Sequence, residues 1–283
     1  MGAAWQAFWY SPVAAVYAAG YALWAVLMLA EAGIGRWQQR PLYAWRDSLT
    51  SLCMYVGYFA INLLWVPVVF LLYTWMHDHA IFQIGIGAWH TGGGGRWWEW
   101  ALLFVLEDLC FYAFHRSSHR FSVFWAAHVT HHSSRYFNLS VAFRQTWTPF
   151  VAVLFWLPLP WLGFDPLMVM TMQMISLFYQ LFLHTQLVPA LGPLEWVFNT
   201  PQHHRLHHAV NAPYVDRNFG GILIIWDRLF GTFAAEQAQE PPRFGIRPDL
   251  VSYNPVTVAF HEWVRLLKKW MALPSRDGGS VPD

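Results

Sequence analysis

Charged side chains are scarce in this sequence of 283 residues, where Asp, Glu, Lys and Arg together occupy only 12% of the positions. Apolar residues occupy 56%, and the mean hydropathy is positive. This composition departs from that of ordinary soluble domains toward that of membrane proteins. The 19 Trp and 12 Tyr residues fit a membrane protein, because amphipathic rings collect at the boundary between hydrocarbon and headgroups, although they would also fill a large core.

Other absences exclude further classes of function. The formal net charge is only +1, which gives no argument for a nucleic-acid partner. The two cysteines, Cys53 and Cys110, both lie in apolar segments, so we predict packing roles and no disulfide framework. The sequence contains no nicotinamide or flavin fingerprint and no fused haem domain. Any redox chemistry is therefore expected to draw its electrons from a separate donor.

Long apolar runs predict three membrane spans. The run from Pro12 to Ile34 is apolar apart from Glu31, and at about 1.5 Å per residue it is long enough to cross a hydrocarbon core of about 30 Å. A second run, from Leu49 to Trp75, contains no charge. The third begins at Trp97 and ends at His115. We expect the first run to remain in the mature protein, because no basic leader precedes it.

Two shorter apolar stretches predict a hairpin that dips into the membrane and returns. They run from Phe150 to Phe164 and from Leu167 to Val188, and the first is short for a complete span. The loop between the first two spans carries Arg36, Arg40 and Arg46. By the positive-inside rule this loop is cytoplasmic, and the expected topology places the segments after the third span and after the hairpin on the same side.

The predicted fold is therefore all-α: an integral membrane helical bundle of about four spans, one a possible re-entrant hairpin, with a cytoplasmic histidine-rich cap. We expect one domain over residues 1–283, with N-terminal spans in 1–100, a histidine-box catalytic region in 101–233, and a cytoplasmic helix and tail in 234–283. An amphipathic helix is expected near Val256 to Trp270, and a disordered tail after Pro274. The connection from His77 to Gly95 is expected to be a flexible loop outside.

Ten of the fourteen histidines form a compact pattern of one HxxxH box, two HxxHH boxes and two further residues. Residues three or four apart lie on one face of a helix, so we expect each box to direct its rings to a common point. Neutral imidazole suits iron, zinc and copper. The eight box histidines exceed what one four-coordinate zinc site uses, so two metal ions are predicted. The predicted ligands are His115, His119, His128, His131, His132, His184, His204, His207 and His208.

Three residues are candidates for catalytic or supporting roles. His184 stands at the end of a predicted span that faces the boxes, and is both a ligand and a catalytic candidate. His203 precedes an HxxHH box that is complete without it, so its role stays open. Asp108 lies two helical turns before His115, and is expected either to accept an imidazole N–H or to pair with Arg116 or Arg120. The isolated histidines are expected to have no metal role: His77, His79, His90 and His261.

At these boxes the sequence resembles the fatty acid hydroxylase and sterol desaturase superfamily of membrane di-iron enzymes. The segments between the boxes are similar to the alkylglycerol monooxygenase subgroup, at Thr130 to Ser134, Leu191 to Glu195 and Gly221 to Asp227 among others. The chain departs from that subgroup at Arg120, where an acidic residue is expected. The resemblance implies two iron ions, with zinc as a substitute in purified protein, and an external reductant, for which tetrahydrobiopterin is one candidate.

The resemblance further implies a lipid substrate from the bilayer, dioxygen as co-substrate and a separate electron donor. The expected reaction is hydroxylation of the carbon next to the ether oxygen of an alkylglycerol, which gives an aldehyde and glycerol. Hydroxylation or desaturation of a sterol, carotenoid or fatty acyl chain is the alternative at the same site. A metal transporter or a membrane metal-binding protein is the alternative from another class, and it would place its ligands near the middle of the membrane.

Overall fold

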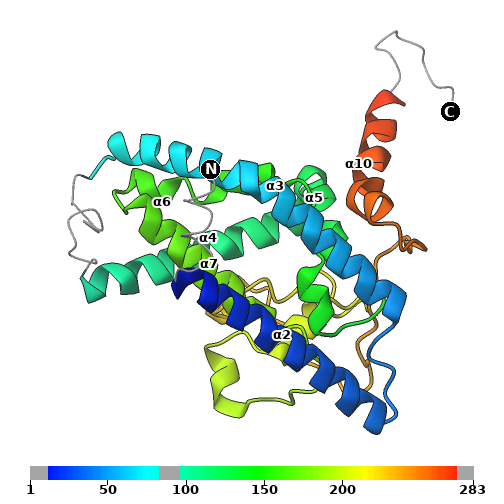
Figure 1. Cartoon of the computed structure of the whole chain (residues 1–283). Coiled ribbons are helices and arrows are strands. Elements are labelled where there is room, and N and C mark those ends of the chain that lie inside the picture. Colours follow the sequence, from blue (N-terminus) through cyan, green and yellow to red (C-terminus); the bar gives the residue numbers. More distant parts are fainter. Residues whose placement is uncertain (1–11, 83–95, 273–283) are drawn as a thin grey trace, which may run out of the picture.

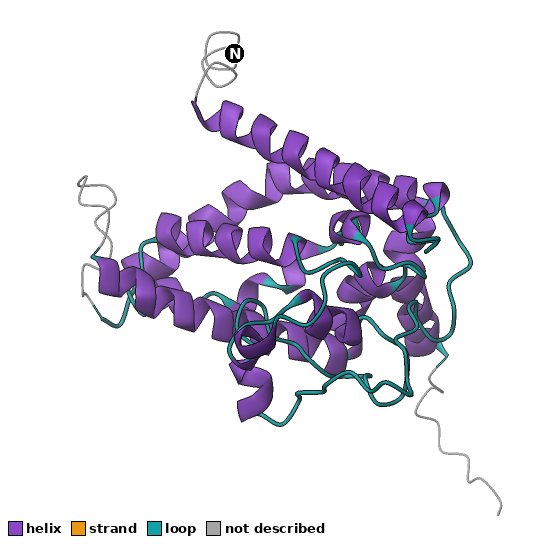
Figure 2. Cartoon of the chain, turned by 90° about the horizontal axis from the view of Figure 1, so that it is seen from below, coloured by secondary structure: helices purple, strands orange, loops and turns teal. Residues whose placement is uncertain are grey.

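The computed structural model describes residues 12–82 and 96–272, and this part of the chain is helical (Figure 1). The α-helices are α2 (Pro12–Trp37), α3 (Trp45–Asp78), α4 (Trp97–Arg120), α5 (Ser122–His132), α6 (Pro158–Trp161), α7 (Pro166–Leu181), α8 (Pro201–His207), α9 (Ile225–Leu229) and α10 (Pro255–Met271). The 3-10 helices are η2 (Leu139–Phe143), η3 (Pro149–Val151), η4 (Val153–Phe155) and η5 (Gly192–Trp196). Figure 2 shows helices and loops but no strand among the described residues, as the all-α prediction requires.

The two N-terminal helices contain the first two apolar runs. Among the described residues, α3 is the helix that is long and apolar enough to cross a membrane, and none of its most apolar stretch is buried. Its outward side chains are strongly exposed, with Leu64 at 78%. α2 and α7 also expose apolar side chains, including Leu29, Ile175 and Phe178. Apolar surface of this extent is typical of a protein that contacts lipid or a partner.

The predicted hairpin is present, but its first limb is not one continuous helix. Residues 149–161 form η3, η4 and α6, because Pro149, Pro158 and Pro160 have no N–H to donate to a regular helix. The chain turns at Gly163, whose φ of 107° suits a residue without a side chain. Asp165 then caps α7, where its Oδ1 accepts a hydrogen bond of 2.8 Å from the Leu167 N–H. Both limbs pack against α3 and α4 around a shared apolar core.

The central helix α4 carries the first histidine box at its C-terminal end. A single bend at Phe121 separates it from α5, which packs against it and carries the second box. Helix α10 packs its buried residues Val258, Ala259 and Leu266 against α5 and α3, and it projects from one end of the molecule in Figure 1. The predicted amphipathic helix at this position is confirmed. The predicted outer loop and the C-terminal tail lie largely outside the described residues.

Candidate metal centre

Nine imidazoles converge between four segments of the chain. They come from the end of α4, from α5, from the turn after α7 and from α8. Together they form two groups, within each of which one nitrogen per ring lies within 4.8 Å of all the others. Group one contains His115, His119, His128, His132 and His207. Group two contains His131, His184, His204 and His208.

In group one the Nε2 atoms face one another. His128 Nε2 lies 3.1 Å from His115 Nε2 and 3.1 Å from His132 Nε2. His132 Nε2 lies 3.1 Å from His207 Nε2. His119 Nε2 is buried and has no hydrogen-bond partner within the described part of the chain. A buried nitrogen without a partner is costly, so this group is suited to a cation that would satisfy it.

Group two has the same arrangement of inward nitrogens. His184 Nε2 lies 3.0 Å from both His131 Nε2 and His204 Nε2. His208 Nε2 lies 3.2 Å from His204 Nε2. The two groups adjoin, because the rings of His132 and His208 stack with centroids 4.3 Å apart and planes 20° from parallel.

Each HxxHH box divides its rings between the two groups. The residues four apart, His128 with His132 and His204 with His208, stay together because they share a helix face. The remaining member turns to the other group: His131 joins group two, and His207 joins group one. The expectation that each box forms one three-ligand face is therefore wrong. Adjacent residues on a helix point about 100° apart, so a neighbouring pair reaches two centres.

Backbone carbonyls orient three of the rings. The Nδ1 atoms of His115, His184 and His207 each lie 2.9 Å from a carbonyl oxygen, those of Phe219, Gln180 and Arg217 respectively. A carbonyl can only accept, so the Nδ1 of each neutral ring carries the proton. The lone pair of Nε2 then points into the group, as a metal ligand requires.

The spacing of the nitrogens fits metal coordination. With metal–nitrogen bonds of about 2.1 Å, ligands at right angles lie about 3.0 Å apart and ligands at the tetrahedral angle about 3.4 Å. The facing Nε2 atoms, 3.0 to 3.2 Å apart, are closer to right angles. Group one also offers five nitrogens, more than a four-coordinate structural zinc site uses. Group one thus fits an ion of higher coordination number, such as iron, and imidazole suits iron chemically.

The surroundings keep these imidazoles neutral. Burial, followed by repulsion from neighbouring rings, lowers the pKa of six of them well below the ordinary value of a histidine. These six are His128, His131, His132, His204, His207 and His208. Neutral rings keep their lone pairs available at physiological pH, which favours metal binding.

Asp108 does not accept an imidazole N–H, nor does it pair with Arg116 or Arg120, so both predictions for it are wrong. Its fully buried carboxylate accepts hydrogen bonds from Ile222 N (2.7 Å), Leu223 N (3.1 Å) and Trp226 Nε1 (2.9 Å). It thereby holds the loop 219–224, whose Phe219 carbonyl orients His115. Asp108 therefore acts on the histidines only through this loop, because its side chain extends from α4 toward the loop and not toward the rings.

Asp227 holds the other side of the same loop and was missed as a candidate. Its carboxylate accepts from Phe219 N (2.8 Å), Gly220 N (2.7 Å) and Thr232 Oγ1 (2.6 Å), and the residue is fully buried. The sequence predicts only a turn at Asp227, whereas the structure places it in α9. No local signal marks it, since an acidic residue beside an arginine is also typical of an exposed turn.

The carboxylate that does lie beside a histidine of the two groups is Asp216. His119 Nδ1 lies 3.5 Å from Asp216 Oδ1. The interaction with His119 also lowers the pKa of Asp216, so the carboxylate stays ionised. A carboxylate on the outer nitrogen of an imidazole fixes its orientation and increases its basicity.

His203 lies outside both groups. Its Nε2 is 3.9 Å from Glu195 Oε2, and its ring contacts Phe233. It lies in α8 directly before His204 and about 100° around the helix from it, so its ring joins neither group. The isolated His79 and His261 bind only backbone carbonyls among the described residues, at Trp75 and Val258. Neither they nor His77 joins a histidine group, and His90 lies outside the described residues.

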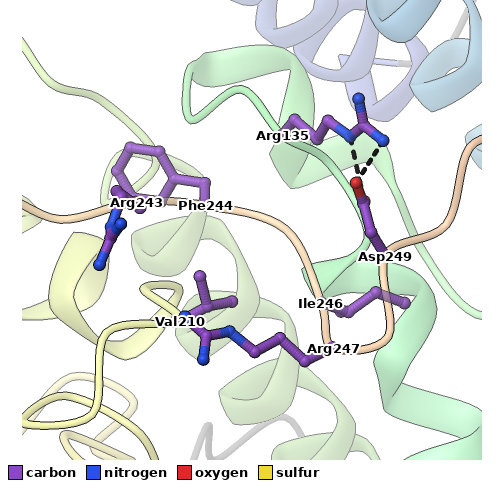
Figure 3. Close-up of a pocket in the computed structure, with 7 residues that line it drawn as sticks. All are labelled: Arg135, Val210, Arg243, Phe244, Ile246, Arg247 and Asp249. Atoms are coloured by element: carbon purple, nitrogen blue, oxygen red, sulfur yellow. Dashed lines mark hydrogen bonds and ion pairs between the residues drawn. The ribbon is translucent and has the colours of Figure 1, made fainter.

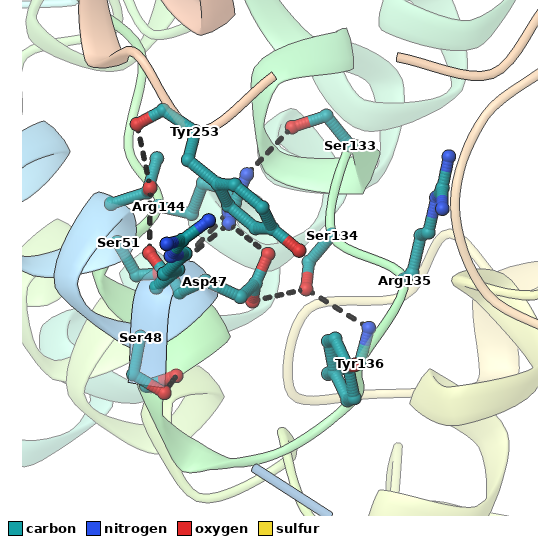
Figure 4. Close-up of polar contacts among 12 residues, drawn as sticks. Asp47, Ser48, Ser51, Ser133, Ser134, Arg135, Tyr136, Arg144 and Tyr253 are labelled. Atoms are coloured by element: carbon teal, nitrogen blue, oxygen red, sulfur yellow. Dashed lines mark hydrogen bonds and ion pairs between the residues drawn. The ribbon is translucent and has the colours of Figure 1, made fainter. Parts of the chain in front are cut away.

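A buried ion pair fixes the end of the second box (Figure 4). Arg144 Nη2 lies 2.5 Å from Asp47 Oδ1, and its Nη1 donates to Ser133 Oγ at 3.1 Å. Ser134 Oγ donates to Asp47 Oδ2 at 2.6 Å. Ser133 and Ser134 directly follow His131 and His132, so this network ties α5 to α3. Helix α3 therefore helps to hold the second box in place.

Glu31 makes a comparable link from α2 and was also missed. Its buried carboxylate accepts from Tyr43 OH at 2.5 Å, from Leu139 N at 2.8 Å and from Thr185 Oγ1. Thr185 follows His184, so the link fixes the segment that delivers this ring to group two. A signal was available, because Glu31 is the one charge within the first apolar run and ionisable residues there are costly.

The chain was compared with known proteins. Residues 100–232, which contain the nine converging histidines, match a family model described as fatty acid hydroxylase. The chain is 39% identical to alkylglycerol monooxygenase of Homo sapiens over 178 residues, which are 62% of this chain and 39% of that protein. It is 34% identical to alkylglycerol monooxygenase of Xenopus tropicalis over 243 residues, which are 84% of this chain and 51% of that protein.

A bacterial relative has a different name. The chain is 31% identical to the ornithine lipid hydroxylase OlsE of Rhizobium tropici over 153 residues, which are 51% of this chain and 45% of that protein. The chain thus spans about half the length, or less, of the curated relatives it matches. No solved structure matches the chain. The resemblance that the histidine boxes indicated is confirmed by the family model and these relatives.

Proposed function

We propose that this chain, whose residues 100–232 match the fatty acid hydroxylase family model, is a membrane monooxygenase that hydroxylates an aliphatic C–H bond of a lipid at two iron ions. The observation that supports this most strongly is the convergence of nine imidazoles in two adjoining groups with their nitrogens turned inward. When bound, the two irons would supply the activation of dioxygen and the oxidation of the C–H bond.

The residues of the chain would hold, orient and shield this centre. Group one would hold one ion and group two the other, with the predicted ligands divided as the geometry divides them. The carbonyls of Phe219, Gln180 and Arg217 would keep the Nδ1 protons in place while Nε2 binds metal. Zinc would occupy the same nitrogens in protein purified without iron.

We propose that the lipid approaches along a row of aromatic rings beside group one. Phe114 contacts His128 with ring centroids 6.5 Å apart, and Phe155 contacts Phe114 at 5.6 Å. Phe124 contacts Phe155 at 5.4 Å and leads to the exposed Phe121. Apolar rings in this position would bind an acyl or alkyl chain and exclude water from the reacting carbon.

For the substrate we propose an alkylglycerol, since the curated relatives at 39% and 34% identity are named alkylglycerol monooxygenases. One oxygen atom of dioxygen would enter the C–H bond next to the ether oxygen, and two electrons and two protons would reduce the other to water. The resulting hemiacetal would break into a fatty aldehyde and glycerol. The histidine groups supply no electrons themselves, so an external donor is needed, and tetrahydrobiopterin is one candidate for it.

The relative named ornithine lipid hydroxylase favours a second candidate, hydroxylation of an acyl chain in a polar lipid. Sterols and carotenoids belong to the same alternative, because the metal groups do not depend on the headgroup. In either case we propose that α2, α3, α4 and the α6–α7 hairpin lie in the membrane. The histidine groups and the connection between α2 and α3, with Arg36 at the end of α2, Arg40 in the loop and Arg46 at the start of α3, would lie on the cytoplasmic side. The single-domain organisation over residues 1–283 remains part of this proposal.

Lipid mass spectrometry tests the proposal. Membranes from cells that express the chain would receive alkylglycerol, a reductant and isotopically labelled dioxygen. We expect alkylglycerol to disappear as labelled fatty aldehyde forms, and His131→Ala and His207→Ala to abolish this conversion and lower the iron content. Unchanged alkylglycerol beside a labelled polar lipid or sterol would favour the second candidate. No labelled lipid from iron-loaded protein would refute both.

A further inference from the structure

A basic pocket of about 340 Å³ opens on the surface near the third histidine box, outside the two histidine groups (Figure 3). Three arginines, Arg135, Arg243 and Arg247, line it together with Asp249 and the ring of Phe244. Arg135 is paired with Asp249, with its Nε 3.0 Å from the carboxylate Oδ1. The pocket therefore carries a net positive charge that comes from the other two arginines.

Arg243 and Arg247 are available to an anionic partner. Both are exposed, and neither guanidinium donates a hydrogen bond to any described residue. A planar guanidinium recognises carboxylate or phosphate oxygens through two parallel hydrogen bonds. Two such groups at one opening are suited to a patch of carboxylates on another molecule.

The pocket is fixed to the third histidine box. Arg243 N donates to Asn211 Oδ1 at 2.8 Å, and Val210 N donates to the Arg243 carbonyl at 2.7 Å. An isolated β-bridge joins Phe244 to Ala209, the residue that follows His208. The pocket wall and the box are thus held by short backbone contacts, so a molecule bound at the pocket has a defined position relative to group two.

Aromatic rings connect the pocket to both histidine groups without interruption. Phe244 stacks on the buried Phe137, with centroids 5.0 Å apart and planes 19° from parallel. Phe137 in turn contacts His208 at 5.1 Å and His184 at 5.7 Å, both in group two. His208 stacks on His132 of group one. This gives a short, packed route from the protein surface to the centre.

We propose that the basic pocket is the docking site of an acidic electron-carrier protein, which delivers electrons through Phe244 and Phe137. This inference rests on the proposed function, which needs two electrons per hydroxylation from outside the chain. In each encounter the carrier would be oxidised by one electron, and one ferric ion held by the histidine groups would be reduced to the ferrous state. Two encounters supply one turnover, and no covalent bond forms or breaks.

An acidic protein suits the pocket better than an anionic lipid does. Redox partners meet through small, transient interfaces that rely on complementary charge for fast association. The two exposed guanidinium groups supply that charge. The stacked rings of Phe244 and Phe137 behind them would carry electrons, which only a redox partner delivers. A lipid headgroup would use the charge but not the route.

The first test measures binding, which needs neither metal nor turnover. The full chain in discs of neutral lipid is titrated with plant-type ferredoxin, an acidic one-electron carrier, at several salt concentrations. We expect affinity that weakens steeply with salt, and a dissociation constant raised at least tenfold in the double variant Arg243→Glu with Arg247→Glu. The matched control, Arg36→Glu with Arg40→Glu, makes the same charge change at exposed sites at the end of α2 and in the turn that follows it, and should bind normally.

The second test measures reduction of the iron-loaded protein by rapid mixing. Phe244→Leu should slow reduction by ferredoxin about tenfold without changing its dissociation constant, because the pocket charge remains. Reduced methyl viologen, a small cation that does not need the docking site, should reduce both pocket variants at least as fast as the wild type. Lipid hydroxylation driven by methyl viologen tests the proposed function separately, so a failure of docking is distinguishable from a failure of the enzyme.

Several outcomes would overturn the docking proposal. One is wild-type protein that does not bind ferredoxin, and another is equal loss of binding in the pocket and control double variants. A third is unchanged ferredoxin affinity in the pocket double variant together with lost binding to vesicles that contain anionic lipid. That third result would identify the pocket as a headgroup site.

Discussion

Replacement of Asp108 by Asn should destabilise the protein and weaken group one, although Asp108 contacts none of the histidine rings. Its carboxylate accepts three buried hydrogen bonds, from Ile222 N, Leu223 N and Trp226 Nε1. An amide has one acceptor oxygen, so its NH2 group would face at least one of these donors. A hydrogen bond to a charged group contributes about 1.5–3 kcal/mol, and a buried donor without a partner costs about 1–3 kcal/mol. We expect a loss of about 3–5 kcal/mol in the free energy of unfolding.

The loop has little freedom to adapt to this change. A side chain added at Gly221 would place its Cβ 2.9 Å from Asp108 Oδ1 and 2.8 Å from Phe111 Cδ1, so the loop already lies against α4. An unfavourable amide at this contact should push residues 219–223 outward. The Phe219 carbonyl would then leave His115 Nδ1, now 2.9 Å away, and His115 would lose its orientation.

Thermal unfolding in detergent and iron analysis measure both effects. A loss of this size corresponds to a decrease of about 6–10 °C in Tm for a chain of this length. The bound iron should fall toward the amount that group two alone would hold. Asp78→Asn is the matched control, because Asp78 is exposed at the end of α3 and should change neither quantity. An unchanged Tm and full iron content in Asp108→Asn would refute the reasoning.

Three further predictions concern the ligands, the ion pair and pH. His204→Ala should lower the iron content whereas His203→Ala should not, because only His204 belongs to a histidine group; equal iron in both variants would contradict this division. Arg144→Met leaves the buried Asp47 carboxylate without its cation and should lower the free energy of unfolding by about 3–5 kcal/mol. Arg135→Met breaks an exposed pair and should lower it by no more than about 1 kcal/mol. Urea titration in detergent would compare the two variants. Burial depresses the pKa of the imidazoles of α5 and α8. Below about pH 6.5 the unfolded chain therefore binds more protons than the folded chain does. The stability that is present above this pH is lost as the pH falls. The Tm of metal-free protein should therefore decrease between about pH 7 and pH 5, and a constant Tm over this window would speak against buried neutral rings.

Much of the fold could be predicted from local patterns. Apolar runs mark α2, α3 and α4 within about five residues at each end, and they mark the start of α7, which ends seven residues before the predicted run does. The spacing of apolar and basic side chains marks α10. The three prolines between 149 and 160 explain why the first limb of the hairpin is irregular, although the sequence reading expected a plain hairpin. These features depend on residues that are close to one another in the sequence, so local patterns are enough to predict them.

The histidine boxes were equally readable, but only as sets. Spacings of three and four residues placed the rings of the three boxes on helix faces and predicted that they bind metal. His184 was predicted as a ligand from its place at the end of an apolar run. The same spacings did not decide the role of His203, which directly precedes His204 and yet lies outside both histidine groups. The spacing within one turn of helix decides which face a ring occupies. The packing of helices distant in sequence decides which face meets the histidine groups.

What the sequence determined by itself is the class of the protein and the chemistry of its donors, because composition and helical spacing are local properties. Only the tertiary structure decided which histidine joins which group, since His131 and His132 point to different centres and the packing of α4, α5 and α8 places those centres. It also decided the partners of the carboxylates. Asp108 and Asp227 meet the loop 219–223 over separations from 7 to 115 residues, and Glu31 meets Thr185 across 154. No periodicity along the chain records contacts at most of these distances, because they form only when helices distant in sequence are brought together.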